Sequence, residues 1–283
     1  MKVLPQSLRA ALLSLLLLVL LTGLWYAATL PKAVSAPSPQ DEYAQLMGKA
    51  SAAPRDDNRF PSPLVFARVA ATLLAHPFAD NGPNDKGVGL QLAASLVRVA
   101  CGYALALLVA LPLGLLIGMS PLCHAALDPF IQVLKPISPL AWMPIALYTI
   151  KDAGISGIFV IFICSVWPML LNTAFGVASV RREWLNVAAT LEVSLPRRIF
   201  LVILPAALPT IVTGMRISMG VAWLVIVAAE MLVGGTGIGY FVWNEWNNLS
   251  LPSVIFAILL IGITGMVLDA GFGWLQRRVQ YAD

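Results

Sequence analysis

The chain has 283 residues, of which 59% are hydrophobic and 11% are charged, and its formal net charge is +4. A mean hydropathy of +0.84 excludes an ordinary soluble globular domain. No basic patch is interleaved with aromatic side chains, which argues against nucleic-acid binding. The three cysteines show no disulfide or metal-ligand spacing. We therefore predict an all-α integral membrane protein that lies in a lipid bilayer and holds no metal or cofactor.

The N-terminal residues predict a first membrane span. Residues 1–9 carry Lys2 and Arg9, and residues 10–30 contain no charge. A helix of this length reaches about 30 Å, which is the thickness of the hydrocarbon core. A cleaved signal peptide with its site at 34–36 is the alternative, but the apolar run is longer than a usual signal-peptide core. We expect an uncleaved span.

Residues 31–92 are predicted to lie outside the membrane, because they are rich in proline and carry charges of both signs. Within them, Pro63 to His76 has the pattern of a short amphipathic helix that would lie along the membrane interface. Residues 78–87 combine Asn, Asp, Gly and Pro, which is turn chemistry, and they lack the terminal glutamate of a calcium loop. These last residues are expected to form a structured surface loop.

The membrane core is predicted over residues 93–283. Three glycines, Gly102, Gly114 and Gly118, predict that its first helix approaches a neighbour closely. Together with the N-terminal span, the apolar runs of this core give six transmembrane helices. The five core spans are predicted at about 96–119, 126–150, 158–180, 206–233 and 254–274.

Three prolines, Pro136, Pro139 and Pro144, interrupt the span at 126–150. They predict a kink, and a kink frees backbone groups that lipid cannot satisfy. This span must therefore face protein or water.

The positive charges predict how the spans are oriented. Six spans place both termini on the same side of the membrane. The positive charges on that side are Lys2, Arg9, Arg277, Arg278 and the arginines of the loop at 181–205. The positive-inside rule makes this common side cytoplasmic. The chain is therefore expected to be a multi-pass protein of the bacterial inner membrane with both termini in the cytoplasm and residues 31–92 outside.

The loop at 181–205 concentrates charge between two apolar runs. Trp184, Ala188, Leu191 and Leu195 have the spacing of one helix face, and Pro196 is expected to end that helix. A compact cationic hairpin of this kind is typical of a docking element for a soluble partner. The alternative from composition alone is an ordinary cytoplasmic loop held inside by its arginines.

The sequence contains no motif for catalysis. It has no G-x-x-x-x-G-K-[ST] motif, so we expect no ATP binding through a P-loop. The glycine-rich residues 234–239 follow a membrane span rather than a strand, and we interpret them as a tight external turn. His76 and His124 are isolated, and no Ser-His-Asp or paired-carboxylate arrangement is visible. We predict that the chain is not an enzyme.

Ionisable side chains at membrane depth are candidates for a substrate pathway, because burying charge in lipid is costly. Lys135 lies in the proline-broken span, and Arg216 and Glu230 lie in the span at 206–233. The two cations could attract an anion, or each could simply pair with a carbonyl or carboxylate inside the bundle. With neutral donors added, the predicted pathway consists of Lys135, Ser138, Trp142, Asn172, Thr173, Arg216 and Glu230.

The residues of 181–205 resemble the cytoplasmic coupling loop of type I permeases from binding-protein-dependent ABC importers. That family's pattern is E-A-A, three residues, Gly, nine residues and I-x-L-P. Here the pattern begins at Asn186-Val187-Ala188, has Glu192 at the glycine position and ends at Leu204-Pro205. Without the glycine, the turn between the two short helices is expected at Ser194 to Pro196. The resemblance implies these coupling residues: Trp184, Ala188, Leu191, Glu192, Leu195, Arg197, Arg198 and Pro205.

The resemblance covers about residues 88–280 and is closest to the nitrate, sulfonate and taurine branch. It is carried by segments that include Ser95-Leu96-Val97-Arg98-Val99, residues 136–144, residues 167–177 and Ala228-Ala229-Glu230-Met231-Leu232. It implies the type I importer fold, two copies of the permease, two ATP-binding subunits and an external substrate-binding protein. The implied substrate is nitrate or nitrite, with sulfonate or taurine, cyanate and bicarbonate as alternatives. A stand-alone secondary transporter and a membrane scaffold are the other classes considered.

Overall fold

The computed structural model describes residues 6–30, 60–82 and 85–279, and every named element in these ranges is a helix. Five helices are long and apolar enough to cross a membrane, or six if the bent pair α5 and α6 counts as one span. The predicted all-helical architecture is confirmed. The helices are α1 Gln6–Ala28, α3 Pro63–Ala75, α4 Val88–Met119, α5 Pro121–Leu134, α6 Pro139–Ile150, α7 Ala153–Ala178, α8 Arg182–Thr190, α9 Leu195–Arg198, η1 Ile199–Ile203, α10 Leu204–Val233, α11 Ile238–Asn247 and α12 Leu251–Val279.

The chain forms two compact units, residues 1–75 with 249–256 and residues 76–248 with 257–283. In the first unit, α1 meets the segment before and within α3. The indole Nε1 of Trp25 donates to the carbonyl of Pro61 at 2.9 Å. Its ring lies 5.9 Å from that of Phe60 and 5.6 Å from that of Phe66. This aromatic contact fixes the end of α1 to the start of α3.

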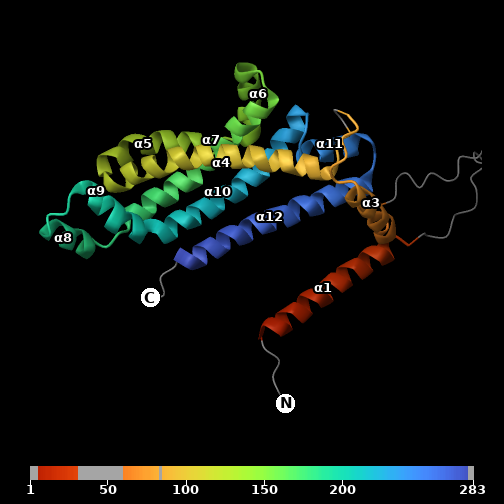
Figure 1. The fold of residues 1–283 in the computed structure, drawn as a ribbon, viewed down its shortest axis with the longest axis horizontal. Helices are drawn as coiled ribbons and strands as arrows, with labels where there is room; N and C mark the ends of the chain where they lie inside the picture. The colour runs from red at the N-terminus through yellow and green to blue at the C-terminus, as the bar shows by residue number, and fades with distance from the viewer. Residues whose placement is uncertain (1–5, 31–59, 83–84, 280–283) are drawn as a thin grey trace, which may run out of the picture. The chain divides into compact units, whose positions relative to one another are not determined.

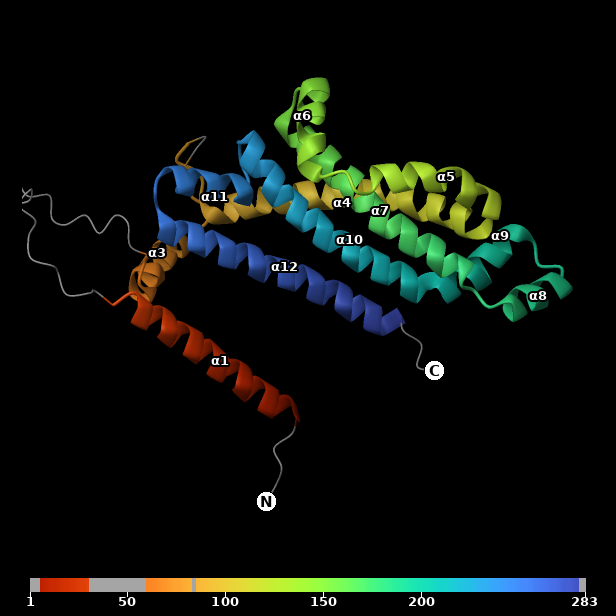
Figure 2. The ribbon, with the colours of Figure 1, turned by 180° about the vertical axis from the view of Figure 1, so that it is seen from behind.

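The second unit is built on α4, α7 and α10, which run side by side in both views (Figures 1 and 2). The glycine stripe of α4 makes this contact close. A Cβ on Gly102, Gly114 or Gly118 would lie 2.6–2.7 Å from atoms of α7, so larger side chains would push the helices apart. The glycines therefore set the interhelical distance, as the sequence predicts.

Residues 126–150 are two helices rather than one kinked span. α5 and α6 meet at an angle of 91°. Pro136 cannot donate a backbone hydrogen bond, and Ser138 is extended because it precedes Pro139 (φ −60°, ψ 137°). α6 projects away from the three-helix bundle (Figure 1). The prolines thus produce a sharp corner where the sequence predicts a bend.

The turn in the coupling loop lies at Glu192, so the prediction that it forms at Ser194 to Pro196 is wrong. α8 ends at Thr190, and Glu192 takes a left-handed conformation with φ of 51°. The Val193 amide donates to the Ala188 carbonyl, and the Glu192 amide donates to the Ala189 carbonyl, each at 3.0 Å. This pair of bonds is a Schellman motif, in which the left-handed residue is usually glycine. The backbone therefore forms a turn that usually contains glycine, although the residue here is a glutamate.

The predicted effect of Pro196 is also reversed. It lies in the first turn of α9, where a proline's missing N–H is not needed, and it begins a helix instead of ending one. From Leu195 the chain stays helical through η1 and α10 to Val233.

The π-helical turn η1 (Ile199–Ile203) directly precedes the Leu204-Pro205 pair that begins α10. Pro205 has no N–H, and its ring would crowd the carbonyl of Leu201 in a regular α-helix. The Leu204 amide instead donates to the carbonyl of Ile199, five residues earlier. The wider turn relieves the crowding, so Leu204-Pro205 explains why a π-helical turn joins the coupling loop to the long helix.

Candidate functional site

Two regions of the second unit concentrate the features that bear on function, and they lie at opposite ends of the α4–α7–α10 bundle (Figures 1 and 2). The α8 end contains the coupling loop. The α11 end contains α11, the start of α4 and the end of α10.

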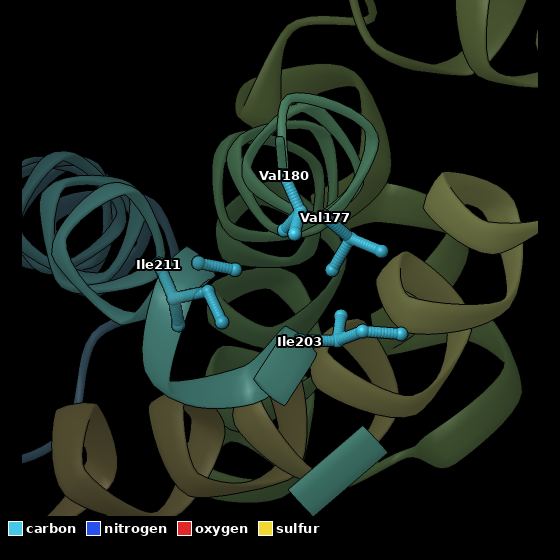
Figure 3. Packing of buried hydrophobic residues seen from close by; sticks show 5 residues of the cluster. Val177, Val180, Ile203 and Ile211 are labelled. Atoms are coloured by element: carbon cyan, nitrogen blue, oxygen red, sulfur yellow. The ribbon is translucent and has the colours of Figure 1, made fainter. Parts of the chain in front are cut away.

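At the α8 end, an apolar cluster joins the coupling loop to the bundle. Its buried members are Val177 at the end of α7, Val180 just after that helix, Ile203 in η1, and Ala207 and Ile211 in α10. The labelled side chains converge on one volume (Figure 3). Leu185 of α8 and Ile199 of η1 pack against the same cluster. Because protein cores are close-packed, a displacement of α8 would be transmitted to α7 and α10.

The predicted coupling residues divide into exposed and buried ones. Trp184, Leu191 and Leu195 are exposed by 47%, 70% and 54%, and they present apolar surface to the outside. Ala188 is 4% exposed and is covered by its own chain. Glu192 and Arg197 are exposed, whereas Arg198 and Pro205 are half-buried. The single helix face predicted over 184–195 is therefore interrupted, since the helix ends before Leu191.

The guanidinium of Arg181 lies 5.6 Å from the ring centroid of Trp184. This cation–π contact holds the indole in place on the outside of α8. The exposed face of α8 is thus an ordered apolar and cationic surface.

At the α11 end, the carboxylate of Glu230 is buried and surrounded by donors. It is 4% exposed. Ser95 Oγ lies 2.7 and 2.9 Å from its two oxygens, and Arg98 Nη1 donates to Oε1 at 2.7 Å. The Gly239 amide donates to Oε2 at 3.1 Å. A buried charge is tolerated only when it is paired and hydrogen-bonded, and Glu230 meets both conditions.

The same network extends to the glycine-rich loop. Gln91 Oε1 accepts from the Gly237 amide at 2.5 Å, and Ser95 Oγ accepts from the Ile238 amide at 2.8 Å. Arg98 Nη1 also donates to the carbonyl of Thr236. Side chains of α4 therefore hold residues 236–238, while Glu230 of α10 lies between them.

Glycine is required in this loop for space as well as for conformation. Gly237 has φ of 156°, and a Cβ there would overlap the Glu230 carboxylate. A Cβ on Gly239 would overlap the carbonyl of Val227. The loop resembles a phosphate-binding sequence, but its backbone encloses a carboxylate of its own chain. The interpretation as a tight turn agrees with this geometry.

A cavity of about 50 Å³ adjoins the network. It is lined by side chains of α4, α6 and α10 together with glycines of α7 and of the loop, chiefly Arg98, Met143, Gly157, Glu230, Gly234 and Gly235. Roughly 10–15 Å³ is enough to hold one water, so this cavity admits a few waters or one small ion. The side chain of Arg98 is 22% exposed and provides its only cation among the described lining residues.

The other predicted pathway residues do not gather at this cavity. Lys135 and Ser138 are exposed at the corner between α5 and α6, and the Trp142 ring lies 6.5 Å from that of Phe159. Asn172 and Thr173 bond to carbonyls of their own helix at 2.8 and 2.7 Å. Among the described residues, no hydrogen bond or ion pair joins any two members of the predicted pathway.

Arg216 is paired in the way that the sequence analysis gives as the alternative. Its Nε and Nη2 donate to the two carboxylate oxygens of Asp269 on α12, each at 2.6 Å. Nη1 donates to Oε1 of Gln276 at 3.2 Å. The charge of Arg216 is therefore balanced by a bidentate partner within this chain.

The sequence analysis missed Arg98, Ser95 and Gln91 as site residues. Their spacing of four and three residues places polar groups on one stripe of an otherwise apolar helix. That stripe was a usable signal. Its partner Glu230 lies 132 residues from Arg98 along the chain, and no local pattern connects the two.

The class of protein follows from the sequence match, which agrees with this helical architecture. Residues 110–281 match the family described as "Binding-protein-dependent transport system inner membrane component", and the chain belongs to that family. It is a permease component of an ABC importer, not an enzyme, and the corresponding predictions are confirmed.

Named relatives narrow the class further. The chain is 44% identical over 228 residues to the nitrate import permease protein NrtB of Synechocystis sp., covering 81% of this chain and 83% of the relative. It is 44% identical over 220 residues to the bicarbonate transport system permease protein CmpB of the same organism, covering 77% and 79%. An inward-facing structure of the MetNI methionine ABC transporter has a TM-score of 0.60 at 12% identity, covering 67% of this chain and 94% of that one. The last likeness supports the fold.

Proposed function

We propose that this permease carries nitrate or nitrite into the cell by alternating access, driven by ATP hydrolysis on separate subunits. The observation that carries the proposal is the 44% identity to a nitrate import permease over most of both chains. Membership of the importer family sets aside the secondary-transporter and scaffold alternatives.

Bicarbonate is the second candidate, because the identity to a bicarbonate permease is also 44%. Nitrate and bicarbonate are both small planar oxyanions with one negative charge, so a single site chemistry serves either. The cavity at the α11 end, about 50 Å³, has room for such an ion. Cyanate remains a further small-anion alternative.

We place the α8 end in the cytoplasm and the α11 end outside. The support is the distribution of charge, since the coupling loop, Lys2, Arg9 and the basic C-terminal residues share one side under the positive-inside rule. Residues 31–92 then lie outside the membrane. Cysteine labelling of residues 181–205 and 78–87 in intact cells and in inverted vesicles tests this orientation.

The exposed side chains of the coupling loop supply the docking surface for the ATP-binding subunits in this proposal. Trp184, Leu191 and Leu195 are apolar and exposed, and Arg197 adds a positive charge beside them. An exposed aromatic side chain that becomes buried on binding, with apolar neighbours, is typical of an interface hot spot. Ala188 is buried and Pro205 is half-buried, so in this proposal they determine the conformation of the loop and do not contact the partner.

Motion of the docked subunits would pass through the apolar cluster to α7 and α10. We propose that two permease copies pair, so that two ATP-binding subunits can act on the two coupling loops. An external substrate-binding protein would deliver the anion to the α11 end. The remaining pathway residues, Lys135, Ser138, Trp142, Asn172, Thr173 and Arg216, stay proposals for the interior of the assembled importer.

The deciding experiment measures uptake of labelled nitrate and of labelled bicarbonate in a strain that lacks this chain and in the complemented strain. Restoration of nitrate uptake supports the proposal, and restoration of bicarbonate uptake alone replaces it with the second candidate. Affinity purification of the tagged chain should also recover a P-loop ATPase. Unchanged nitrate uptake in both Lys135→Ala and Arg216→Ala would remove these two cations from the pathway.

A further inference from the structure

Arg98 uses only one part of its guanidinium within the chain. Both of its protein acceptors, the Glu230 carboxylate and the Thr236 carbonyl, bond to Nη1. Among the described residues, no acceptor is hydrogen-bonded to Nε or Nη2. Two parallel N–H groups on one edge of the planar group are therefore unoccupied.

Arg216 shows what this edge does when an anion is available. There the same two nitrogens, Nε and Nη2, hold the carboxylate of Asp269 in a bidentate pair, with both contacts at 2.6 Å. The planar fork of arginine matches planar oxyanions for this reason. The open edge of Arg98 is thus chemically competent to hold a carboxylate-like anion, and none of the residues in the described ranges provides one there.

Two glycines of α7 lie beside the Arg98 side chain. A Cβ placed on Gly154 would lie 3.8 Å from Arg98 Nε, and one on Gly157 would lie 4.0 Å from Arg98 Cδ. Both glycines lie in the first turns of α7, and Gly157 lines the cavity of about 50 Å³. The N-terminal end of this 26-residue helix adds partial positive charge on the same side.

Besides Glu230, which lines the cavity, a second acidic group lies near this space. Asp152 Oδ1 would lie 3.4 Å from a Cβ on Gly154, but this oxygen accepts from the Ile155 amide at 2.7 Å, which caps α7. No ion pair joins Asp152 to Arg98 among the described residues. Its carboxylate is a competitor for the open edge, and this limits the expected affinity for a free anion.

We propose that the open edge of Arg98 and the adjoining cavity form a binding site for one small planar oxyanion at the α11 end of the permease. The proposal rests on the proposed function, since it gives the transported nitrate-like anion a place on this chain. Glu230 is a positioning residue: it holds Nη1, so that Nε and Nη2 are left for the anion. The cavity of about 50 Å³ has room for nitrate, nitrite or bicarbonate.

The test uses the purified complex of the permease with its ATP-binding subunits in lipid nanodiscs, without the substrate-binding protein. The thermal midpoint is followed as sodium nitrate replaces sodium gluconate at constant ionic strength. A specific site raises the midpoint of the wild type by about 3 °C when nitrate is at about ten times its Kd, and the rise grows with the logarithm of the nitrate concentration. Non-specific salt effects are common to all variants, so the difference between variants isolates the site.

Arg98→Lys is the informative variant. Its ammonium can still bond to Glu230 and to the Thr236 carbonyl, but it has no second edge. The nitrate-dependent rise should be lost while the midpoint in gluconate stays near that of the wild type. Arg68→Lys is the matched control, since Arg68 is exposed on α3 and should keep the full rise. If Arg98→Lys does not fold, the double variant Arg98→Gln with Glu230→Gln removes the site without leaving an unpaired charge.

The outcomes separate the site from the transport function. A nitrate-dependent rise that persists in Arg98→Lys overturns the site, even if the strain imports nitrate. A rise with bicarbonate but not nitrate keeps the site and overturns nitrate as the substrate. No rise with nitrate, nitrite or bicarbonate in the wild type overturns the site, whatever the uptake assay shows.

Discussion

The two ends of the α4–α7–α10 bundle are held together by different kinds of contact. At the α11 end, directional hydrogen bonds converge on the buried carboxylate of Glu230 from α4 and from the backbone of α11. At the α8 end, apolar side chains of α7, η1 and α10 pack into one cluster, and the surface outside that cluster is also apolar. The first arrangement permits one geometry, because every donor has a direction. The second is non-directional and leaves surface for a partner.

The difference explains how one end of an importer subunit can stay rigid while the other end moves with its partner. A buried ion pair resists small displacements, since moving either charge away from its partner exposes both to an apolar interior. Apolar packing tolerates a rigid-body shift of a whole element provided that the density of contacts is kept. We therefore expect substitutions at the α11 end to affect stability first, and substitutions at the α8 end to affect partner binding as well.

The largest effect is expected for Glu230→Ala. The substitution leaves the Arg98 guanidinium, the Ser95 hydroxyl and the Gly239 amide without their acceptor in a buried site. Breaking a buried ion pair in this way lowers the free energy of unfolding by about 3–5 kcal/mol. Denaturant unfolding in mixed micelles measures the loss.

A double variant sharpens that measurement. Arg98→Gln with Glu230→Gln removes both charges and keeps hydrogen-bonding groups, so it should be more stable than Glu230→Ala. A double variant as unstable as the single one would show that packing around the carboxylate, rather than the ion pair, holds the α11 end.

Ile203→Ala should have the next largest effect. Ile203 is 5% exposed in the apolar cluster, and its truncation leaves a cavity between η1 and α7. The expected loss is about 3 kcal/mol in the free energy of unfolding. Leu201→Ala is the matched control, because Leu201 lies in the same π-helical turn and is 72% exposed. Equal losses in the two variants would contradict the role of the cluster.

Trp184→Ala should weaken binding of the ATP-binding subunits without lowering stability. Loss of an exposed aromatic anchor at an interface costs about 2 kcal/mol of binding free energy, or roughly a thirty-fold weaker complex. Quantitative co-purification measures this loss. Trp274→Ala is the control, because Trp274 is 58% exposed and stacks on Arg278 at 5.1 Å in the same way as Trp184 on Arg181. Normal ATPase recovery with Trp184→Ala would remove the indole from the interface.

Much of the helical core was predictable, because hydropathy and proline residues determine the secondary structure of the segment in which they occur. A long apolar run must satisfy its backbone as a helix, and the prolines between Pro136 and Pro144 interrupt that helix wherever they fall. The size of the break was not predictable: a proline-rich run is compatible with a gentle kink or with the 91° corner that separates α5 from α6. Which one forms depends on what each half packs against.

The candidate site was only partly predictable, since its members are joined through space. Glu230 was predicted because a charge at membrane depth is costly, but its side-chain donors come from a helix more than a hundred residues earlier. The same argument of cost selected Arg216, whose partner Asp269 neutralises it. The position of a charged side chain within a membrane span shows only that it needs hydrogen-bond or ion-pair partners. The packing shows which partners the described residues provide: Arg216 has a bidentate carboxylate, whereas Arg98 is bonded through Nη1 alone.

The smallest predicted effect concerns the turn at Glu192, and it has the opposite sign. A residue with a Cβ in the left-handed region is strained by about 1 kcal/mol relative to glycine, and Glu192 has φ of 51° with its side chain exposed. Glu192→Gly should therefore raise the free energy of unfolding by up to about 1 kcal/mol, since the Schellman bonds are already formed. Glu192→Ala keeps the strain and is the matched control. If the glycine variant is no more stable than the alanine variant, the glutamate side chain must contribute a compensating contact, and its position on the outer face of the coupling loop would make the ATP-binding subunit the partner to examine.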